Sequence, residues 1–146
     1  MPKATFSHRA RTIHGPHVVW QQLQRAETWA SIGPVDEVWS PVHDDNGALM
    51  RYEWSSRIGP TRHKGSATVV ASDVGKLMRL DLDGGEMSGT LTTEIEPEEN
   101  GATIAVTLDI ASKGTLSGMF FPLVADAVGR GLPEQVSRFV TALDTP

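Results

Sequence analysis

The chain has 146 residues, of which 39% are hydrophobic and 21% are charged, a balance typical of an ordinary globular domain. Its net charge of −5 argues against a nucleic-acid partner, which would favour a basic surface, so we expect no such partner. The absence of cysteine excludes disulfides, thiolate metal sites and cysteine nucleophiles. The first residues lack the apolar segment of a secretory signal, and no apolar run approaches the ~18 residues that span a bilayer. We therefore expect a cytoplasmic protein with one domain, residues 1–146, and no membrane insertion.

The N-terminal part predicts one strand followed by two short helices. Residues 4–13 form a periodic, strand-like segment that ends at Gly15-Pro16. Because the ring of Pro16 fixes a helical φ, residues 17–24 are predicted to form a helix. A second short helix is predicted over residues 26–32.

The next part of the chain has the pattern of consecutive β-hairpins. Turn signals rich in Gly, Asn and Asp separate its strand-like runs at residues 44–47, 59–60, 73–75, 83–85 and 99–101. Within the runs, apolar residues alternate with polar ones, which is the period of a half-buried strand. The apolar faces of four runs are Met50, Tyr52 and Trp54; Met78, Leu80 and Leu82; Met87, Gly89, Leu91, Thr93 and Ile95; and Ile104, Val106, Leu108 and Ile110. This pattern predicts an antiparallel meander of six strands with one apolar face.

The C-terminal segment, residues 116–143, has helical periodicity. Its apolar stripe consists of Phe120, Val124, Val128, Leu132, Val136, Phe139 and Leu143. Pro133 lies within the segment, and a proline inside a helix removes a hydrogen bond. We expect a kink or a short break near residues 129–133.

Together these elements predict an α+β fold in which a seven-stranded, curved antiparallel sheet surrounds the long C-terminal helix. Strands of 8 to 10 residues span about 27–34 Å, whereas one helix is only about 10–12 Å wide. A single long helix therefore covers too little of the apolar face, and an internal cavity is expected. The alternative is that tryptophan, phenylalanine and methionine side chains fill this space.

Three segments carry a resemblance to a known family. They are residues 16–23, whose pattern Pro-x-x-Val-Trp-x-x-Leu is displaced by one residue at Val19-Trp20 from the family's Pro-x-x-x-Val-Trp-x-x-Leu opening; Trp29 followed by residues 32–35; and the proline and Gly-x-Thr hairpin of residues 96–103. Their order resembles the START-like or SRPBCC superfamily, which includes polyketide cyclase and dehydrase relatives and birch-pollen-allergen-like ligand carriers. The resemblance implies a helix-grip fold with a hydrophobic pocket between sheet and helix. It implies no single activity, because members bind, carry or convert different apolar molecules.

Two residues are candidates for a catalytic or orienting role. Alternation along residues 61–71 places His63 on the inward face, where an imidazole can act as a base or orient a carbonyl. Tyr52, the one tyrosine, is also predicted inward and needs a hydrogen-bond partner if it is buried. The alternatives are a solvent-touching histidine at the rim and a tyrosine that only packs in the core.

The predicted ligand-binding residues share the inward faces of the strands and of the long helix. They are Trp29, Met50, Tyr52, Trp54, His63, Ala67, Leu80, Met87, Gly89, Leu91, Val106, Phe120, Val124, Ala127, Val128 and Gly131. His14, His17 and His43 have no second pair of metal-binding side chains at a suitable spacing, so neither a metal nor a cofactor is expected.

The leading functional hypothesis is binding of a small hydrophobic molecule, such as a lipid, a polyketide or an aromatic metabolite. An alternative is a cyclase, aromatase or dehydratase that uses the same cavity, with His63 or Tyr52 transferring a proton. A third possibility is an interaction module with a filled core, for example a homodimer joined through a sheet edge or through helices.

Overall fold

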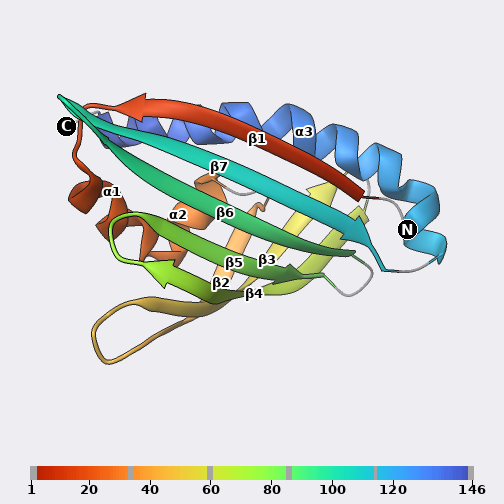
Figure 1. The fold of residues 1–146 in the computed structure, drawn as a ribbon. Coiled ribbons are helices and arrows are strands. Elements are labelled where there is room, and N and C mark those ends of the chain that lie inside the picture. The colour runs from red at the N-terminus through yellow and green to blue at the C-terminus, as the bar shows by residue number, and fades with distance from the viewer. Residues whose placement is uncertain (1–2, 33–34, 59–60, 85–86, 114, 145–146) are drawn as a thin grey trace.

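The computed structural model describes residues 3–32, 35–58, 61–84, 87–113 and 115–144. Along the chain it contains β1 (Lys3–Thr12), α1 (Pro16–Leu23), α2 (Ala26–Ile32), β2 (Glu37–His43), β3 (Leu49–Ile58), β4 (Thr61–Asp73), β5 (Leu77–Asp83), β6 (Met87–Glu98), β7 (Gly101–Ser112) and α3 (Thr115–Asp144) (Figure 1). The predicted order of elements is confirmed.

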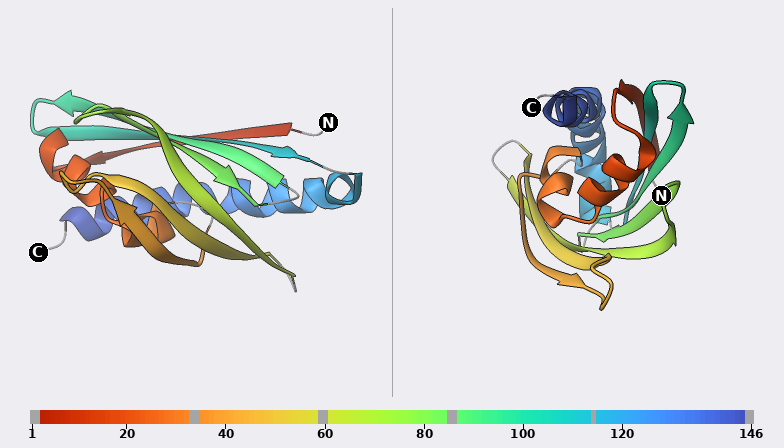
Figure 2. Two further views of the ribbon diagram at one scale, coloured as in Figure 1. Left: turned by 90° about the horizontal axis from the view of Figure 1, so that it is seen from below. Right: turned by 90° about the vertical axis from the view of Figure 1, so that its left-hand side faces the viewer.

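The seven strands form one antiparallel sheet in the order β1-β7-β6-β5-β4-β3-β2. Each strand from β2 to β6 pairs with the next one along the chain, and β1 pairs with β7 to complete the sheet. Gly47 and Gly75 have φ values of 83° and 77°, which supply the left-handed backbone that two of the turns need. The sheet curves around α3 (Figure 2). This is the predicted helix-grip architecture.

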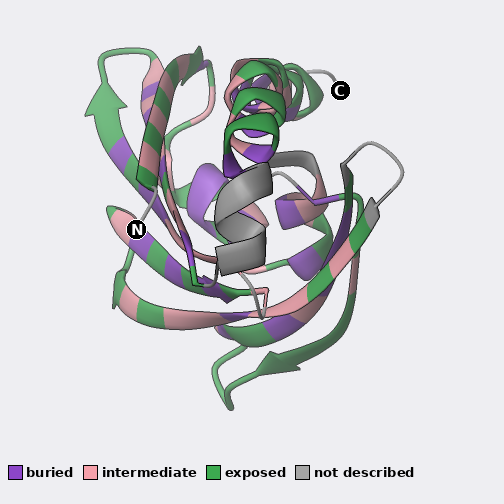
Figure 3. Ribbon diagram, turned by 90° about the vertical axis from the view of Figure 1, so that its right-hand side faces the viewer, coloured by how far each residue is buried: buried purple, intermediate pink, exposed green. Residues whose placement is uncertain are grey.

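The short helices fill one end of the hollow that the sheet encloses. Figure 2 shows α1 and α2 inside the curve of the sheet, and Figure 3 shows that buried residues gather on the inner side. Val19, Leu23 and Trp29 from these helices are completely buried. The strands and α3 contribute further fully buried side chains at Leu49, Tyr52, Met78, Leu80, Leu91, Ile104, Leu108 and Leu132. This end of the interior is therefore packed with large side chains.

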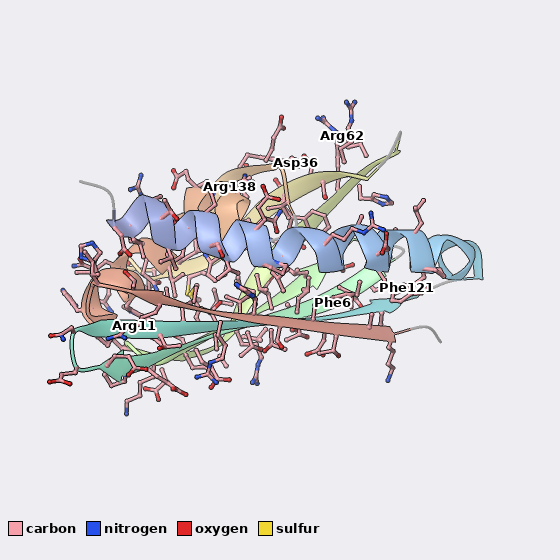
Figure 4. The ribbon with its side chains drawn as sticks, turned by 90° about the horizontal axis from the view of Figure 1, so that it is seen from above. Phe6, Arg11, Asp36, Arg62, Phe121 and Arg138 are labelled. Carbon is pink, nitrogen blue, oxygen red and sulfur yellow. The ribbon has the colours of Figure 1, made fainter. Side chains whose placement is uncertain are left out.

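Helix α3 covers only part of the sheet. It packs chiefly on β1 and α2, and to a smaller extent on β7. The ring of Phe6 lies between β1 and α3 (Figure 4), where a Cβ atom on Gly129 would be only 2.6 Å from its Cε1 atom. Glycine at this position thus allows the helix to approach the strand closely.

Of the kink or short break expected near residues 129–133, the break does not occur, because α3 is helical through Pro133. Leu132 and Val136, on either side of the proline, are both fully buried. We attribute the continuity of the helix to this packing, which holds both turns against the core although Pro133 donates no backbone hydrogen bond.

The edge strand β2 is irregular, and this affects one predicted core residue. Its pairing with β3 shifts between Trp39 and Val42 and again between Val42 and His43. The sequence predicts Met50 on the same inward face as Tyr52, but the side chain of Met50 is 43% exposed. Its neighbour Leu49 takes the buried position, because the strand pairing is shifted there. The prediction for Met50 was wrong.

None of the described helices is both long enough and apolar enough to cross a bilayer.

Candidate ligand-binding site

A cavity of about 70 Å³ lies between α3 and the sheet, at the opposite end of the interior from α1. Its walls are almost entirely apolar, and one side opens to the surface. It is lined by Trp54, Ser56 and His63 from β3 and β4; by Leu82, Gly84, Met87, Ser88 and Gly89 from the β5–β6 region; and by Val35, Ile110, Val124 and Val128. A single water needs only about 10–15 Å³, so the space exceeds an ordinary packing defect.

The position of the cavity follows from the way in which the helices cover the sheet. Helix α3 packs chiefly on β1 and β7, and α1 and α2 fill the far end, so among the described residues no helix packs extensively on the inner face near the β3–β4 and β5–β6 hairpins. Several residues there are small, namely Ser56, Gly84, Ser88 and Gly89. Small side chains leave this region unfilled.

The indole of Trp54 forms one wall of the cavity and packs against two glycines. A Cβ atom on Gly65 would lie 2.5 Å from Cζ2 of Trp54, and one on Gly84 would lie 3.2 Å from Cη2. The ring therefore packs directly against the backbone of its neighbours. Trp54 is only 9% exposed, and its Nε1 atom has no hydrogen-bond partner among the described residues.

His63 and Ser56 form the polar part of the cavity wall. They are directly opposite each other in the β3–β4 ladder, two residues beyond the pair of Trp54 and Gly65. His63 is half-buried and lines the cavity together with Ser56. The alternation that places His63 inward thus brings it next to the apolar space.

Tyr52 lies in the packed core and does not line the cavity. It is opposite Ala67 in the β3–β4 ladder and almost completely buried. Burial raises the pKa of its phenol above the ordinary value of 10. This is the arrangement of a core side chain.

The predicted ligand-binding residues divide into those that line the cavity and those that lie in the packed interior. Those that line the cavity are Trp54, His63, Met87, Gly89, Val124 and Val128. Those in the packed interior are Trp29, Tyr52, Ala67, Leu80, Leu91 and Val106, which have the right face but line none of the pockets found among the described residues. The side chain of Phe120 lies outside the described residues.

Six wall residues are absent from the predicted set: Val35, Ser56, Leu82, Gly84, Ser88 and Ile110. Leu82 and Ile110 belong to apolar faces that the alternation identifies, so the signal for them was present in the sequence. Ser56 follows Tyr52 and Trp54 with the same period. Nothing in the local pattern indicates Val35, which follows α2 and reaches the site only through the tertiary fold.

A second, more polar pocket of about 110 Å³ adjoins the cavity and shares Ser56 and Val128 with it. The predicted residues Ala127 and Gly131 line this pocket rather than the cavity. The remaining lining residues are Asp36, Arg57 and Gln135. The backbone N–H of Arg57 donates to Oδ2 of Asp36 at 2.6 Å, whereas Oε1 of Gln135 is buried without a partner among the described residues. The apolar cavity thus borders a polar pocket.

A larger depression of about 400 Å³ lies on the outer side of the sheet, across β1, β5, β6 and β7. Its charged and polar side chains interact with one another: Nζ of Lys113 is 2.6 Å from Oδ1 of Asp83, and the hydroxyl of Thr5 donates to Oδ1 of Asp109 at 2.5 Å. This surface has the features of a solvated, self-paired face.

Two of the other histidines hydrogen-bond to backbone carbonyl groups. Nε2 of His14 donates to the carbonyl oxygen of Leu143 at 2.6 Å, and Nε2 of His43 donates to that of Gln24 at 2.8 Å. In the part of the chain that the structure describes, no group of three His, Asp or Glu side chains is arranged to hold a metal ion.

Comparison with known proteins supports the fold. No family model and no curated protein matches the chain. Among solved structures, it is similar to a START superfamily protein from Mycobacterium smegmatis, with a TM-score of 0.73, 14% identity and 96% of each chain covered. It is also similar to the protein TTHA0849 from Thermus thermophilus, with a TM-score of 0.71, 14% identity, and 97% of this chain and 100% of that chain covered.

A third similar structure is the Zhui aromatase/cyclase from Streptomyces sp. R1128, with a TM-score of 0.62, 10% identity, and 99% of this chain and 100% of that chain covered. At these identities the likeness concerns the fold alone. The chain has the START-like, or SRPBCC, helix-grip fold, as the resemblance implied.

Proposed function

We propose that this protein binds a small hydrophobic molecule, such as a lipid, a polyketide or an aromatic metabolite, in the cavity between the sheet and α3. The observation that carries this proposal is the cavity of about 70 Å³ with nearly all-apolar walls and one open side. Transfer of apolar surface from water into such a site contributes about 25 cal/mol per Å² before the costs of association.

The size of the cavity limits what can be enclosed. A cavity of about 150 Å³ is known to hold benzene, so a space of about 70 Å³ encloses only part of a typical ligand. The rest of the molecule extends through the open side or into the adjoining polar pocket beside Gln135. A molecule with an apolar part and one polar end suits both spaces.

A fluorescent apolar probe, of the kind whose emission rises in a dry site, tests the proposal. We expect saturable binding by the purified protein and loss of that binding in Val124→Phe, where the larger ring fills the cavity. Val18→Phe on the exposed side of α1 is the matched control and retains binding. Native mass spectrometry of the purified protein adds the mass of any retained molecule. Absence of probe uptake by folded wild-type protein would refute the proposal.

A second candidate function is a cyclase, aromatase or dehydratase that acts on an enclosed molecule. The observation in its favour is the imidazole of His63 in the cavity wall, within a fold that the Zhui aromatase/cyclase also has. Tyr52 loses its candidacy, because it lies in the packed core. For a substrate that the protein turns over, His63→Ala should abolish turnover and Tyr52→Phe should retain it. Normal turnover by His63→Ala would exclude this role.

The presence of the cavity argues against an interaction module with a filled core. A homodimer that also binds a ligand is compatible with the proposal. The same native mass spectrum gives the number of subunits, so it distinguishes a monomer from a dimer.

A further inference from the structure

His63 and Ser56 place polar groups in a cavity wall that is otherwise almost entirely apolar. The two residues are directly opposite each other in the β3–β4 ladder, so their side chains share one face of the sheet. Ser56 is 8% exposed, His63 is half-buried, and both line the cavity. The Cβ atoms of opposite residues in an antiparallel pair are about 4.5–5.5 Å apart, so a single group of a bound molecule can contact both side chains.

The charges around this pair favour an anion over a cation. None of the described residues that line the cavity is acidic. Arg62 and Lys64 flank His63 in β4, although the whole chain has a net charge of −5. By alternation their side chains leave the strand on the opposite face from His63, so they act on the cavity through their electric field and not by contact.

Two carboxylates lie close to this basic segment, and both interact with it. Oδ2 of Asp36 accepts the backbone N–H of Arg57 at 2.6 Å, and Oε1 of Glu37 is 3.9 Å from Nη2 of Arg62. Asp36 lines the adjoining polar pocket and not the cavity itself. The negative charges therefore lie beside the basic segment and outside the cavity wall.

A carboxylate matches the hydrogen-bonding groups of this pair. The imidazole of histidine donates from a ring N–H, and the hydroxyl of serine donates its proton, whereas a carboxylate only accepts and has two oxygens for that purpose. Hydrogen bonds to an ionised acceptor are about twice as strong as those between neutral groups. An amide of the same shape has one oxygen and no charge, so it gains less from the same two donors.

We propose that the cavity binds a small apolar carboxylic acid, and that the ring N–H of His63 and the hydroxyl of Ser56 donate to its carboxylate. This proposal rests on the proposed binding function and names the chemical class of the ligand. The apolar chain of the acid lies in the cavity against Trp54 and Val128. Its carboxylate lies at the edge where Ser56 borders the adjoining polar pocket.

Hexanoate and hexanamide isolate the contribution of the carboxylate, because they have the same apolar chain and nearly the same shape. At neutral pH, where the acid is ionised, we expect the wild-type protein to bind hexanoate more tightly. His63→Phe keeps a ring without the donor and should weaken hexanoate binding about ten- to hundred-fold, while hexanamide binding changes little. Ser56→Ala should weaken hexanoate binding about ten-fold. His17→Phe, at an exposed position of α1, is the matched control and keeps the preference.

Nuclear magnetic resonance of the imidazole groups gives a second, independent measurement on the wild-type protein. The ring signals of His63 should shift on addition of hexanoate and much less on addition of hexanamide. The ring signals of His17, which lies on α1 and does not line the cavity, should stay in place with both. This measurement decides the question even if His63→Phe does not fold.

The outcomes separate the two proposals. Equal affinity for hexanoate and hexanamide, with no shift of the His63 signals, overturns the carboxylate assignment and leaves hydrophobic binding intact. A preference for hexanoate that survives in both His63→Phe and Ser56→Ala assigns the carboxylate to other groups and also overturns it. Binding of neither molecule, together with saturable uptake of the fluorescent apolar probe, overturns the acid as the ligand class and retains the binding function.

Discussion

At the scale of single residues, the buried hydroxyl of Thr93 is expected to lower the stability of the protein. Thr93 is fully buried between Met78 and Val106 in the sheet, and its Oγ1 atom has no partner among the described residues. Replacement by the isosteric valine removes an unpaired polar group. We therefore expect Thr93→Val to raise the free energy of unfolding by about 1 kcal/mol, measured by urea denaturation.

Thr92→Val is the matched control for this change. The Oγ1 atom of Thr92 accepts a hydrogen bond from Nε of Arg79 at 3.2 Å. Thr92→Val therefore removes a hydrogen bond, whereas Thr93→Val removes an unpaired hydroxyl. Thr92→Val should leave stability unchanged or lower it by up to about 1 kcal/mol. Equal gains from both valines would contradict the explanation.

The buried phenol of Tyr52 predicts a loss of stability in alkaline solution. Burial raises its pKa in the folded state above 10, the value in the unfolded chain. Below pH 10 both states keep the proton, so the contribution of this residue is fully present. Above pH 10 the unfolded chain loses the proton first, and the free energy of unfolding falls by up to about 1.4 kcal/mol per pH unit.

Urea denaturation below and above pH 10, on wild type and on Tyr52→Phe, measures this effect. The variant should show a smaller decline with pH. Because Tyr52 is the one tyrosine in the chain, the near-ultraviolet absorbance of its phenolate also reports its ionisation directly. Phenolate that forms at pH 10 in the folded protein would contradict the prediction.

The sequence predicts which face of the sheet a residue lies on. It does not predict whether an inward residue packs in the core or lines the cavity. Alternation places both Tyr52 and Trp54 inward, yet one packs in the core and the other lines the cavity. The difference depends on where α1 and α2 end, which is a property of the tertiary fold. For the same reason Val35 carries no local signal for its place in the wall.

At the scale of elements, two glycines in α3 predict opposite effects of the same substitution. A Cβ atom on Gly129 would be 2.6 Å from the ring of Phe6, whereas one on Gly131 would have no atom nearer than 3.8 Å. Gly131→Ala should raise the free energy of unfolding by up to about 1 kcal/mol, because alanine favours the helix. Gly129→Ala should lower it by about 1 kcal/mol, since overpacking outweighs the gain in helix propensity.

Thermal denaturation of the two variants measures this difference. If Gly129→Ala stabilises the protein as much as Gly131→Ala does, the close contact between β1 and α3 plays no part in stability.

The order and types of the elements were predictable because turn residues and periodicity are local signals. The irregular pairing of β2 and the unbroken course of α3 through Pro133 were not. Both depend on neighbours far away in sequence: the shifted ladder with β3 exposes Met50, and buried packing on either side of Pro133 holds the helix.

At the scale of the whole molecule, the interior has a filled end and an open end. Val128 borders the cavity, whereas Val136, two turns further along α3, is fully buried. Val136→Ala should lower the free energy of unfolding by about 2 kcal/mol without any change in ligand binding, and Val128→Ala should lower it by less, about 1 kcal/mol. Only Val128→Ala should admit larger ligands.

A series of alkylbenzenes of increasing length measures the largest molecule that each variant binds. The same size limit in wild type and Val128→Ala would show that the ligand does not reach this wall.

The sequence predicts a cavity because one long helix covers too little of the sheet. The structure has this cavity, but α1 and α2 occupy part of the space that α3 leaves uncovered. The cavity is accordingly smaller than a wide curved sheet alone would leave.

The irregular edge strand β2 also limits the pairing of strands between neighbouring molecules. Ser40 has a φ of 51° and is followed by Pro41, which has no N–H group, so the outer row of backbone donors and acceptors is interrupted. A strand from another copy cannot continue the ladder across this point. Although Trp39 and Val42 are exposed there, we expect this border not to serve as a template for fibril growth, even in concentrated solution.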